Sequence, residues 1–185
     1  MQLYLIRHAH TQAHTDVDAA AWTLSERGRQ QALALAQAAF WPHVDRIVLS
    51  REAKTRLTIE PVLAKFKLPI VTDGRFDELH RGGWIADYSA HVAQAFAAPQ
   101  TPAGAWESAA DARQRFVSGI DALIDTYPHE TIALVGHGLT LSLYRAHLLG
   151  QPTVKLADWQ NLPFAAVALV EPQTHQLLSD FRAVG

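Results

Sequence analysis

Residues 131–150, TIALVGHGLTLSLYRAHLLG, join a buried strand directly to a helix. The apolar run over residues 131–137 has the length of a strand and stops at polar residues. Helical spacing follows over residues 138–150, and Gly150 is suited to end that helix. A strand that passes straight into a helix is the repeating unit of α/β proteins, so this stretch indicates that fold class.

The same alternation of strand and helix extends on both sides of this unit. We expect strands at residues 2–7, 46–50 and 69–73, helices at residues 25–40, 51–66 and 106–127, a short helix near residues 86–98, and paired strands over residues 165–172 and 175–183. Leu33, Ala36 and Phe40 are expected to form the buried face of the first helix, and Pro61 to kink or break the second. The pattern predicts a three-layer αβα sandwich with a mostly parallel central sheet.

The composition narrows the classes of partner. The 185 residues carry a formal charge of -2 and include no cysteine, which excludes disulfides, thiolate chemistry and sulfur-ligated zinc. Neither nucleic acid nor an anionic membrane is expected as a partner at this charge. No stretch is long enough to span a bilayer, and residues 1–10 do not read as a signal peptide, so we expect a cytoplasmic protein.

Three of the expected strands stop at polar side chains that are suited to catalysis. These are Arg7 and His8 after the first strand, Ser50, Arg51 and Lys54 after the second, and His137 and Gly138 after strand 131–137. In a parallel sheet the carboxyl ends of the strands meet at one crevice. Histidines and cations gathered there disfavour one another's protonation, and they are best suited to hold an anion such as phosphate.

Five stretches, taken in order, resemble the histidine phosphatase superfamily, also called phosphoglycerate mutase-like proteins. LIRHAHT (residues 5–11) is similar to the family signature LIRHGxT, and LSERGRQQA (24–32) is similar to the first helix of the family. LSREAKTRLTIEPV (49–62) is similar to its second strand and helix, and FDELHRGGW (76–84) to its L-x-E-x-x-x-G-x-W segment. VGHG (135–138) is similar to the second histidine motif of the family. The resemblance covers nearly the whole chain. It implies one domain over residues 1–185, with residues 79–104 as a small insertion over the active site.

The resemblance also implies a role for each matching side chain. His8 attacks phosphorus and forms a phosphohistidine, while Arg7 clamps two phosphate oxygens. His137 donates to another oxygen. Glu78 protonates the leaving oxygen and later helps water to attack, with neighbouring Asp77 as its substitute. The activity implied is hydrolysis of a phosphate monoester on a small phosphorylated substrate, without a metal or organic cofactor.

Three positions depart from the family pattern. Ala9 stands where the family has glycine, which matters if the backbone there needs a positive φ. Lys54 stands where the family has an arginine; it keeps the charge but loses bidentate geometry, and Arg51 is a nearby substitute. His14 stands where asparagine is common. We therefore expect Arg7, Lys54, His137 and Arg51 to bind phosphate, and Thr11, His14 and Gly138 to contact the substrate.

Three other functions are compatible with these residues. His8, His10, His14 and Asp16, with His137, have spacings that suit a divalent metal and would make a metallohydrolase. The family fold could also serve a binding module that only senses a phosphorylated ligand. A phosphoglycerate mutase-type transfer uses the same phosphohistidine, but it needs a lid that excludes water, and residues 79–104 offer little material for one.

Two further expectations concern aromatic residues. Trp84, Tyr88, His91 and Phe96 either shape the substrate pocket or pack a small helical subdomain over the sheet. The closing strands leave a sheet edge, where Trp159 or Phe164 could cover the edge or pair with another chain in a homodimer.

Overall fold

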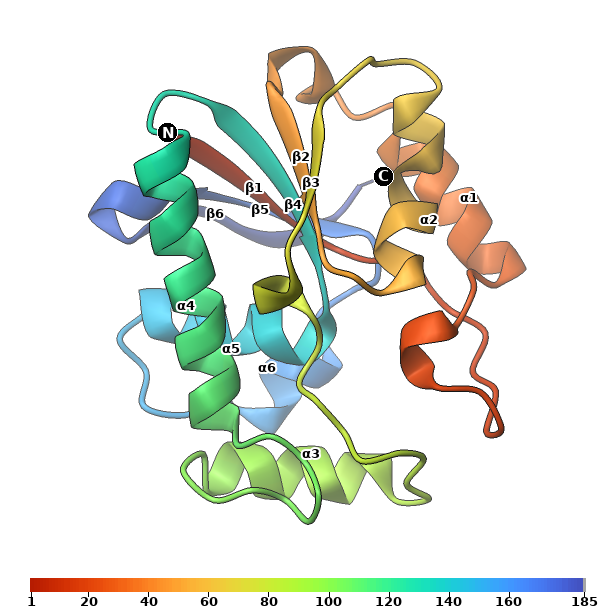
Figure 1. Cartoon of the computed structure of the whole chain (residues 1–185), viewed down its shortest axis with the longest axis vertical. Coiled ribbons are helices and arrows are strands. Elements are labelled where there is room, and N and C mark those ends of the chain that lie inside the picture. The colour runs from red at the N-terminus through yellow and green to blue at the C-terminus, as the bar shows by residue number, and fades with distance from the viewer. Residues whose placement is uncertain (185) are drawn as a thin grey trace.

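The computed structural model describes residues 1–184 and contains one six-stranded sheet (Figure 1). Its strands are β1 (Gln2–Arg7), β2 (Arg46–Leu49), β3 (Ile70–Thr72), β4 (Thr131–Gly136), β5 (Ala166–Glu171) and β6 (Gln176–Ala183). Their order across the sheet is β3-β2-β4-β1-β5-β6. The first four strands in this order are mutually parallel, whereas β5 is antiparallel to β1 and β6 to β5. The expected mostly parallel sheet with a closing hairpin is confirmed.

Helices cover both faces of the sheet. They are α1 (Glu26–Leu35), α2 (Ala53–Leu63), α3 (Tyr88–Ala97), α4 (Ala109–Thr126), α5 (Gly138–Leu148) and α6 (Leu156–Gln160). Figure 1 shows α1 and α2 on one face and α4 and α5 on the other. No helix within residues 1–184 is both long and apolar enough to cross a membrane.

Each face of the sheet buries its own hydrophobic core, because successive side chains of a strand point in opposite directions. Leu3 and Leu5 of β1 pack with Phe116 of α4 and Tyr144 of α5. Ile6 packs on the other face, in the core that α1 and α2 cover. The two cores make the αβα sandwich that the alternation of strands and helices predicts.

A third apolar cluster lies at the end of the sheet where the parallel strands finish. There α3 packs beside α6 and the first turns of α5, around Val92, Phe96 and Leu143. In Figure 1, α3 lies across the lower end of the molecule. Residues 76–88, which precede α3, run along this end and lead the chain to the site described below.

The structure corrects several sequence-based boundaries. The first helix ends at Leu35, and Leu33 is 50% exposed, so it does not belong to the buried face as expected. Pro61 lies inside α2, within two residues of its end, and does not break it. Helix α6 was not predicted, because a segment of five residues is too short to show helical periodicity.

Gly28 allows α1 to approach the loop that follows β1. A β-carbon at this position would lie only 1.9 Å from the carbonyl oxygen of His10. Ser25 begins the helix by accepting a hydrogen bond from the N–H of Gly28 at 3.1 Å. The helix start is therefore packed directly against the backbone just beyond His8.

Candidate active site

Arg7, His8 and His137 lie together because β1 and β4 are parallel neighbours in the middle of the sheet. Their pairing sets Arg7 opposite Gly136, and the N–H of His8 donates to the Gly136 carbonyl at 2.9 Å. His137 follows Gly136 in the chain, and its ring centroid lies 5.3 Å from the ring centroid of His8. The expected convergence of strand ends thus brings the two histidines into one site.

His8 presents its Nε2 atom as a free base. Its Nδ1 lies 2.8 Å from the carbonyl oxygen of Ala9, and a carbonyl can only accept, so Nδ1 must carry the hydrogen. Burial, followed by the charges of His137, Lys54 and Arg7, places the pKa of His8 well below its ordinary value. The ring is therefore neutral near pH 7, with a lone pair on Nε2 as a phosphoryl acceptor needs.

His137 is fully buried and held by Ser50, the residue that follows β2. Its Nε2 lies 2.7 Å from the Ser50 hydroxyl and 3.5 Å from Oε1 of Glu52, while its Nδ1 has no protein partner. Burial lowers the pKa of His137 well below the ordinary value, and the charge of Lys54 acts in the same direction. Sequence reasoning placed Ser50 at this strand end but did not assign it to His137.

Arg7 is fixed between an aromatic ring and a glycine. Its guanidinium carbon lies 3.9 Å from the ring centroid of Phe164, and Nη1 donates to the carbonyl of Leu162. On the other side, a β-carbon at Gly138 would be 3.0 Å from Nη2. Arg7 Nε is buried without a protein partner, and burial lowers the pKa of the guanidinium.

Lys54 is buried in the same site and is paired with Glu52, a residue that sequence reasoning missed. The Nζ of Lys54 lies 2.5 Å from Oε2 of Glu52, and both side chains are less than a tenth exposed. Oε1 of Glu52 also accepts from the N–H of Glu78 at 2.8 Å. Glu52 thus links Lys54 to the backbone of Glu78.

Glu78 is anchored at the start of α5. Its Oε1 accepts from the N–H groups of Leu79 and Thr140, at 3.0 and 3.1 Å, and its Oε2 accepts from the N–H of Leu139 at 3.1 Å. The N-terminus of a helix favours a carboxylate through its unpaired N–H groups and its dipole. These bonds fix the carboxyl group beside His137, the residue just before the helix.

Arg51 and Asp77 form an ion pair at the edge of the site. Asp77 accepts from the backbone N–H of Arg51 at 2.8 Å, and the nearest side-chain atoms are 2.6 Å apart. The Arg51 side chain is 66% exposed, whereas Lys54 is buried near the histidines. Of the two residues expected to take the place of the family arginine, Lys54 thus lies deeper in the site.

Alanine at position 9 fits the backbone without strain. In residues 1–184, only Ala165 and His175 are non-glycine residues with a positive φ. Ala9 is completely buried, and its N–H donates to the Thr58 hydroxyl at 2.9 Å. The departure from the family glycine therefore leaves the loop intact.

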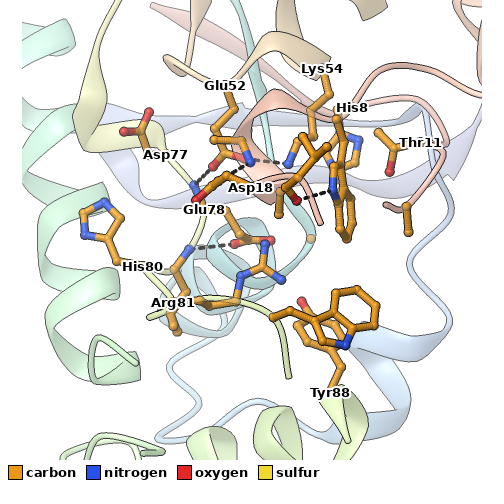
Figure 2. A pocket seen from close by; sticks show the side chains of 18 of the residues that line it. His8, Thr11, Asp18, Glu52, Lys54, Asp77, Glu78, His80, Arg81 and Tyr88 are labelled. Atoms are coloured by element: carbon orange, nitrogen blue, oxygen red, sulfur yellow. Dashed lines mark hydrogen bonds and ion pairs between the residues drawn. The ribbon is translucent and has the colours of Figure 1, made fainter. Parts of the chain in front are cut away.

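Arg7, His8, Glu52, Lys54 and Glu78 line one cavity of about 860 Å³, whereas the fully buried His137 is not among its lining residues. Thr11 and Gly138, which were expected to contact the substrate, line this cavity, and so does Arg81, which sequence reasoning did not select. His14 is exposed and is not among the lining residues; its carbonyl accepts from the indole N–H of Trp22 at 3.1 Å. Figure 2 shows His8, Glu52 and Lys54 at one end of the cavity and Tyr88 at the other.

Six aromatic side chains line the same cavity, and we call them the aromatic wall: Trp22, Trp84, Tyr88, Trp106, Trp159 and Phe164. Trp84 and Tyr88 thus shape the pocket, whereas His91 is not among its lining residues and Phe96 belongs to the apolar cluster around α3. The expectation that Trp159 or Phe164 covers the sheet edge is wrong, because both turn towards the cavity. Trp22 was missed because an isolated aromatic residue in a polar loop gives no periodic signal.

The residues of the metallohydrolase hypothesis are not gathered into a metal site. Within residues 1–184, no group of three or more His, Cys, Asp or Glu side chains is placed to hold a metal ion. His10 is instead bonded to the Ser25 hydroxyl at 2.8 Å, and His14 and Asp16 are exposed. The spacing in the sequence suggested ligands that the fold keeps apart.

The site can be compared with known proteins. The sequence matches the histidine phosphatase superfamily (branch 1) over residues 3–180. It is 24% identical to the probable phosphoglycerate mutase GpmB of Cronobacter sakazakii, covering 90% of this chain and 88% of that protein.

Two solved structures share the fold closely. A mycobacterial glucosyl-3-phosphoglycerate phosphatase in complex with inorganic phosphate is 26% identical, with a TM-score of 0.72 over 92% of this chain and 89% of that one. A mutant phosphoserine phosphatase of Entamoeba histolytica is 17% identical, which shows the fold alone, with a TM-score of 0.75 over 99% and 97%. With the family match spanning nearly all of its length, the chain belongs to the histidine phosphatase superfamily.

Proposed function

We propose that this protein is a phosphatase that hydrolyses a phosphate monoester through a phosphohistidine on Nε2 of His8. The observation that carries the proposal is the state of His8: neutral, with Nδ1 bonded to a carbonyl and Nε2 free, beside the partly buried Arg7 and the buried Lys54. The matched solved structure named as a glucosyl-3-phosphoglycerate phosphatase supports the same activity.

The first step transfers the phosphoryl group to the enzyme. The Nε2 lone pair of His8 forms a bond to phosphorus, and the bond from phosphorus to the ester oxygen breaks. Arg7 and Lys54 neutralise charge on the phosphoryl oxygens, and His137 donates a hydrogen bond. The leaving oxygen takes a proton from the carboxyl group of Glu78.

The second step returns the enzyme to its starting state. Water attacks phosphorus, its proton passes to Glu78, and the P–N bond breaks so that Nε2 regains its lone pair. The oxygen Oε2 of Glu78 accepts a single backbone N–H, which leaves it one lone pair for this proton. The three backbone hydrogen bonds hold Glu78 in one place for both steps.

Rapid-quench labelling with a 32P-labelled phosphate monoester tests the proposal. We expect alkali-stable, acid-labile label on the wild-type protein and none on His8→Ala. His10→Ala, which changes a histidine of the same loop, is the matched control and retains the label. Absence of label and of released phosphate from the wild type would contradict the proposal and favour a module that only binds phosphorylated ligands.

The relative named as a probable phosphoglycerate mutase makes transfer to a second acceptor the alternative function. The same experiment separates the two activities. A hydrolase converts the label to inorganic phosphate, whereas a mutase offered labelled phosphoglycerate moves it to the isomeric phosphoglycerate. We expect inorganic phosphate as the product.

A further inference from the structure

The aromatic wall begins directly at the phosphate-binding end of the cavity. Phe164 lies 3.9 Å from the guanidinium carbon of Arg7, and its ring centroid is 5.5 Å from that of His8. The Trp22 ring lies 5.8 Å from Nζ of Lys54. A group attached to a phosphate at His8 is therefore within reach of the rings of Phe164 and Trp22.

Two tryptophans extend this surface towards solvent. The ring centroids of Trp22 and Trp84 are 6.4 Å apart at an angle of 54°. Trp22 is held in place because its N–H donates to the carbonyls of His14 and Val17, each at 3.1 Å. Trp84 is 55% exposed, and an exposed tryptophan that lines a cavity is typical of a ligand contact.

The wall continues to the far end of the cavity through Tyr88. Its ring centroid lies 5.5 Å from that of Trp106 and 6.0 Å from that of Trp159. The rings meet at inclined angles, as packed aromatic side chains prefer. The cavity thus offers aromatic faces along its length, where a flat ring would bury more apolar area than a chain of hydroxyl groups.

The cavity carries charges of both signs beyond its phosphate-binding end. Its Arg and Lys side chains are Arg7, Arg51, Lys54 and Arg81. Arg51 and Lys54 are paired with Asp77 and Glu52.

Arg81 lies towards the far end of the cavity, with its guanidinium carbon 5.2 Å from the ring centroid of Tyr88. The exposed side chains of Asp16 and Asp18 line the cavity as well. A carboxylate on a leaving group that stacks beside Trp22, in the loop of these two acids, would therefore meet negative charge, whereas a group that reaches Tyr88 would meet Arg81.

We infer that the substrate is a phosphate monoester whose leaving group is a planar aromatic ring without negative charge. This inference rests on the phosphatase function proposed above. It separates the protein from enzymes whose substrates are phosphorylated sugar acids or amino acids. The aromatic wall supplies the selectivity for the ring, and Asp16 and Asp18 act against anionic groups.

The test compares three esters with closely similar leaving oxygens: benzyl, cyclohexylmethyl and 4-carboxybenzyl phosphate. We expect kcat/KM for benzyl phosphate to exceed that for cyclohexylmethyl phosphate about fivefold, the size of an aromatic contact beyond its area. We expect it to exceed that for the carboxylated ester by at least a similar factor. Equal values for the three esters, with His8 labelled by each, would overturn the inference and leave the phosphatase function standing.

Two tryptophan variants test whether the aromatic wall causes the preference for an aromatic leaving group. Trp84→Ala, which removes a half-exposed side chain, and Trp22→Leu, which keeps an apolar group, should each reduce the benzyl-to-cyclohexylmethyl ratio towards one. Leu33→Ala, an exposed apolar residue on α1 outside the cavity, should leave the ratio unchanged. A ratio that stays high in both tryptophan variants would contradict the inference.

A second set of variants tests whether Asp16 and Asp18 act against anionic leaving groups. Asp16→Asn combined with Asp18→Asn should raise kcat/KM for 4-carboxybenzyl phosphate relative to benzyl phosphate, and the effect should fade at high salt. Asp125→Asn, an exposed acid on α4, is the control and should change neither ester. If no ester is hydrolysed and none labels His8, the proposed phosphatase function itself fails.

Discussion

Gly138 and Arg7 are in such close contact that a β-carbon at position 138 would lie 3.0 Å from Nη2 and 3.1 Å from Cζ of the arginine. Phe164 covers the guanidinium 3.9 Å away. The arginine therefore has little room to yield, and a glycine at the first residue of α5 is part of how the site orients it.

Gly138→Ala should displace the Arg7 guanidinium and lower kcat/KM about tenfold or more, because small misplacements of positioning groups are costly in catalysis. Gly136→Ala is the matched control, since a β-carbon there would meet its nearest neighbour at an ordinary 3.5 Å. Steady-state kinetics on benzyl phosphate measures both. Unchanged kinetics in Gly138→Ala would show that Arg7 tolerates the shift.

Glu52→Gln should tighten the binding of inorganic phosphate. The substitution keeps an oxygen for the Glu78 N–H but removes a buried negative charge from beside Lys54. Coulomb interactions at these distances amount to about 1 kcal/mol or more, so the inhibition constant of phosphate should fall about fivefold.

The control for Glu52→Gln is Glu130→Gln, which breaks an ion pair with Arg46 at the opposite end of the sheet. It should leave phosphate inhibition unchanged. Weaker phosphate inhibition in Glu52→Gln would show instead that the carboxylate serves mainly to hold Lys54 in position.

Ser50→Ala should lower kcat by about tenfold, because His137 loses the hydroxyl that lies 2.7 Å from its Nε2. Ser50→Thr keeps the hydroxyl and should recover most of the activity. Thermal unfolding followed by circular dichroism checks that both variants fold. If Ser50→Ala and Ser50→Thr are equally active, the Ser50 hydroxyl does not orient His137.

Stability should fall as the pH falls below about 6.5, the ordinary pKa of histidine. The folded pKa values of His8 and His137 are depressed, chiefly by burial, so in this range the unfolded chain binds protons that the folded chain does not. Each group then removes at most about 1.4 kcal/mol per pH unit. Activity should persist at these pH values, because the nucleophile stays neutral.

Urea unfolding at pH 7.0 and 5.5 measures this dependence. His137→Asn should show a smaller difference between the two pH values than the wild type. His43→Asn, an exposed histidine outside the site, should behave like the wild type. Equal pH dependence in all three proteins would mean that the buried histidines take up protons in the folded state.

Much of the architecture could be predicted because strands and long amphipathic helices leave periodic patterns. Strand 131–136 and helix α5 are examples, since a buried strand and a helix of eleven residues each exceed the length at which the pattern is readable. Helix α6 and the exposure of Leu33 were beyond this reasoning. Both depend on which neighbours pack nearby, a property that a local pattern does not contain.

For the site, the sequence pattern placed the residues at strand ends, the family resemblance added Glu78, and Glu52 and Trp22 were missed. Arg7, His8 and His137 follow from the parallel arrangement of β1 and β4. Glu52 is set by its bonds to Lys54 and Glu78, and Trp22 by two backbone carbonyls. Such contacts join segments whose distance in the fold no local motif specifies.

The hydrogen bond from His8 to Gly136 in the centre of the sheet affects which parts of the site can vary by substitution. The amide of His8 can exchange with solvent only when its hydrogen bond to β4 opens. Trp22 and Trp84 are carried by surface loops, where local opening costs less. Under the proposed function, substitutions in these loops can alter the choice of leaving group without opening the hydrogen bond that ties His8 to β4.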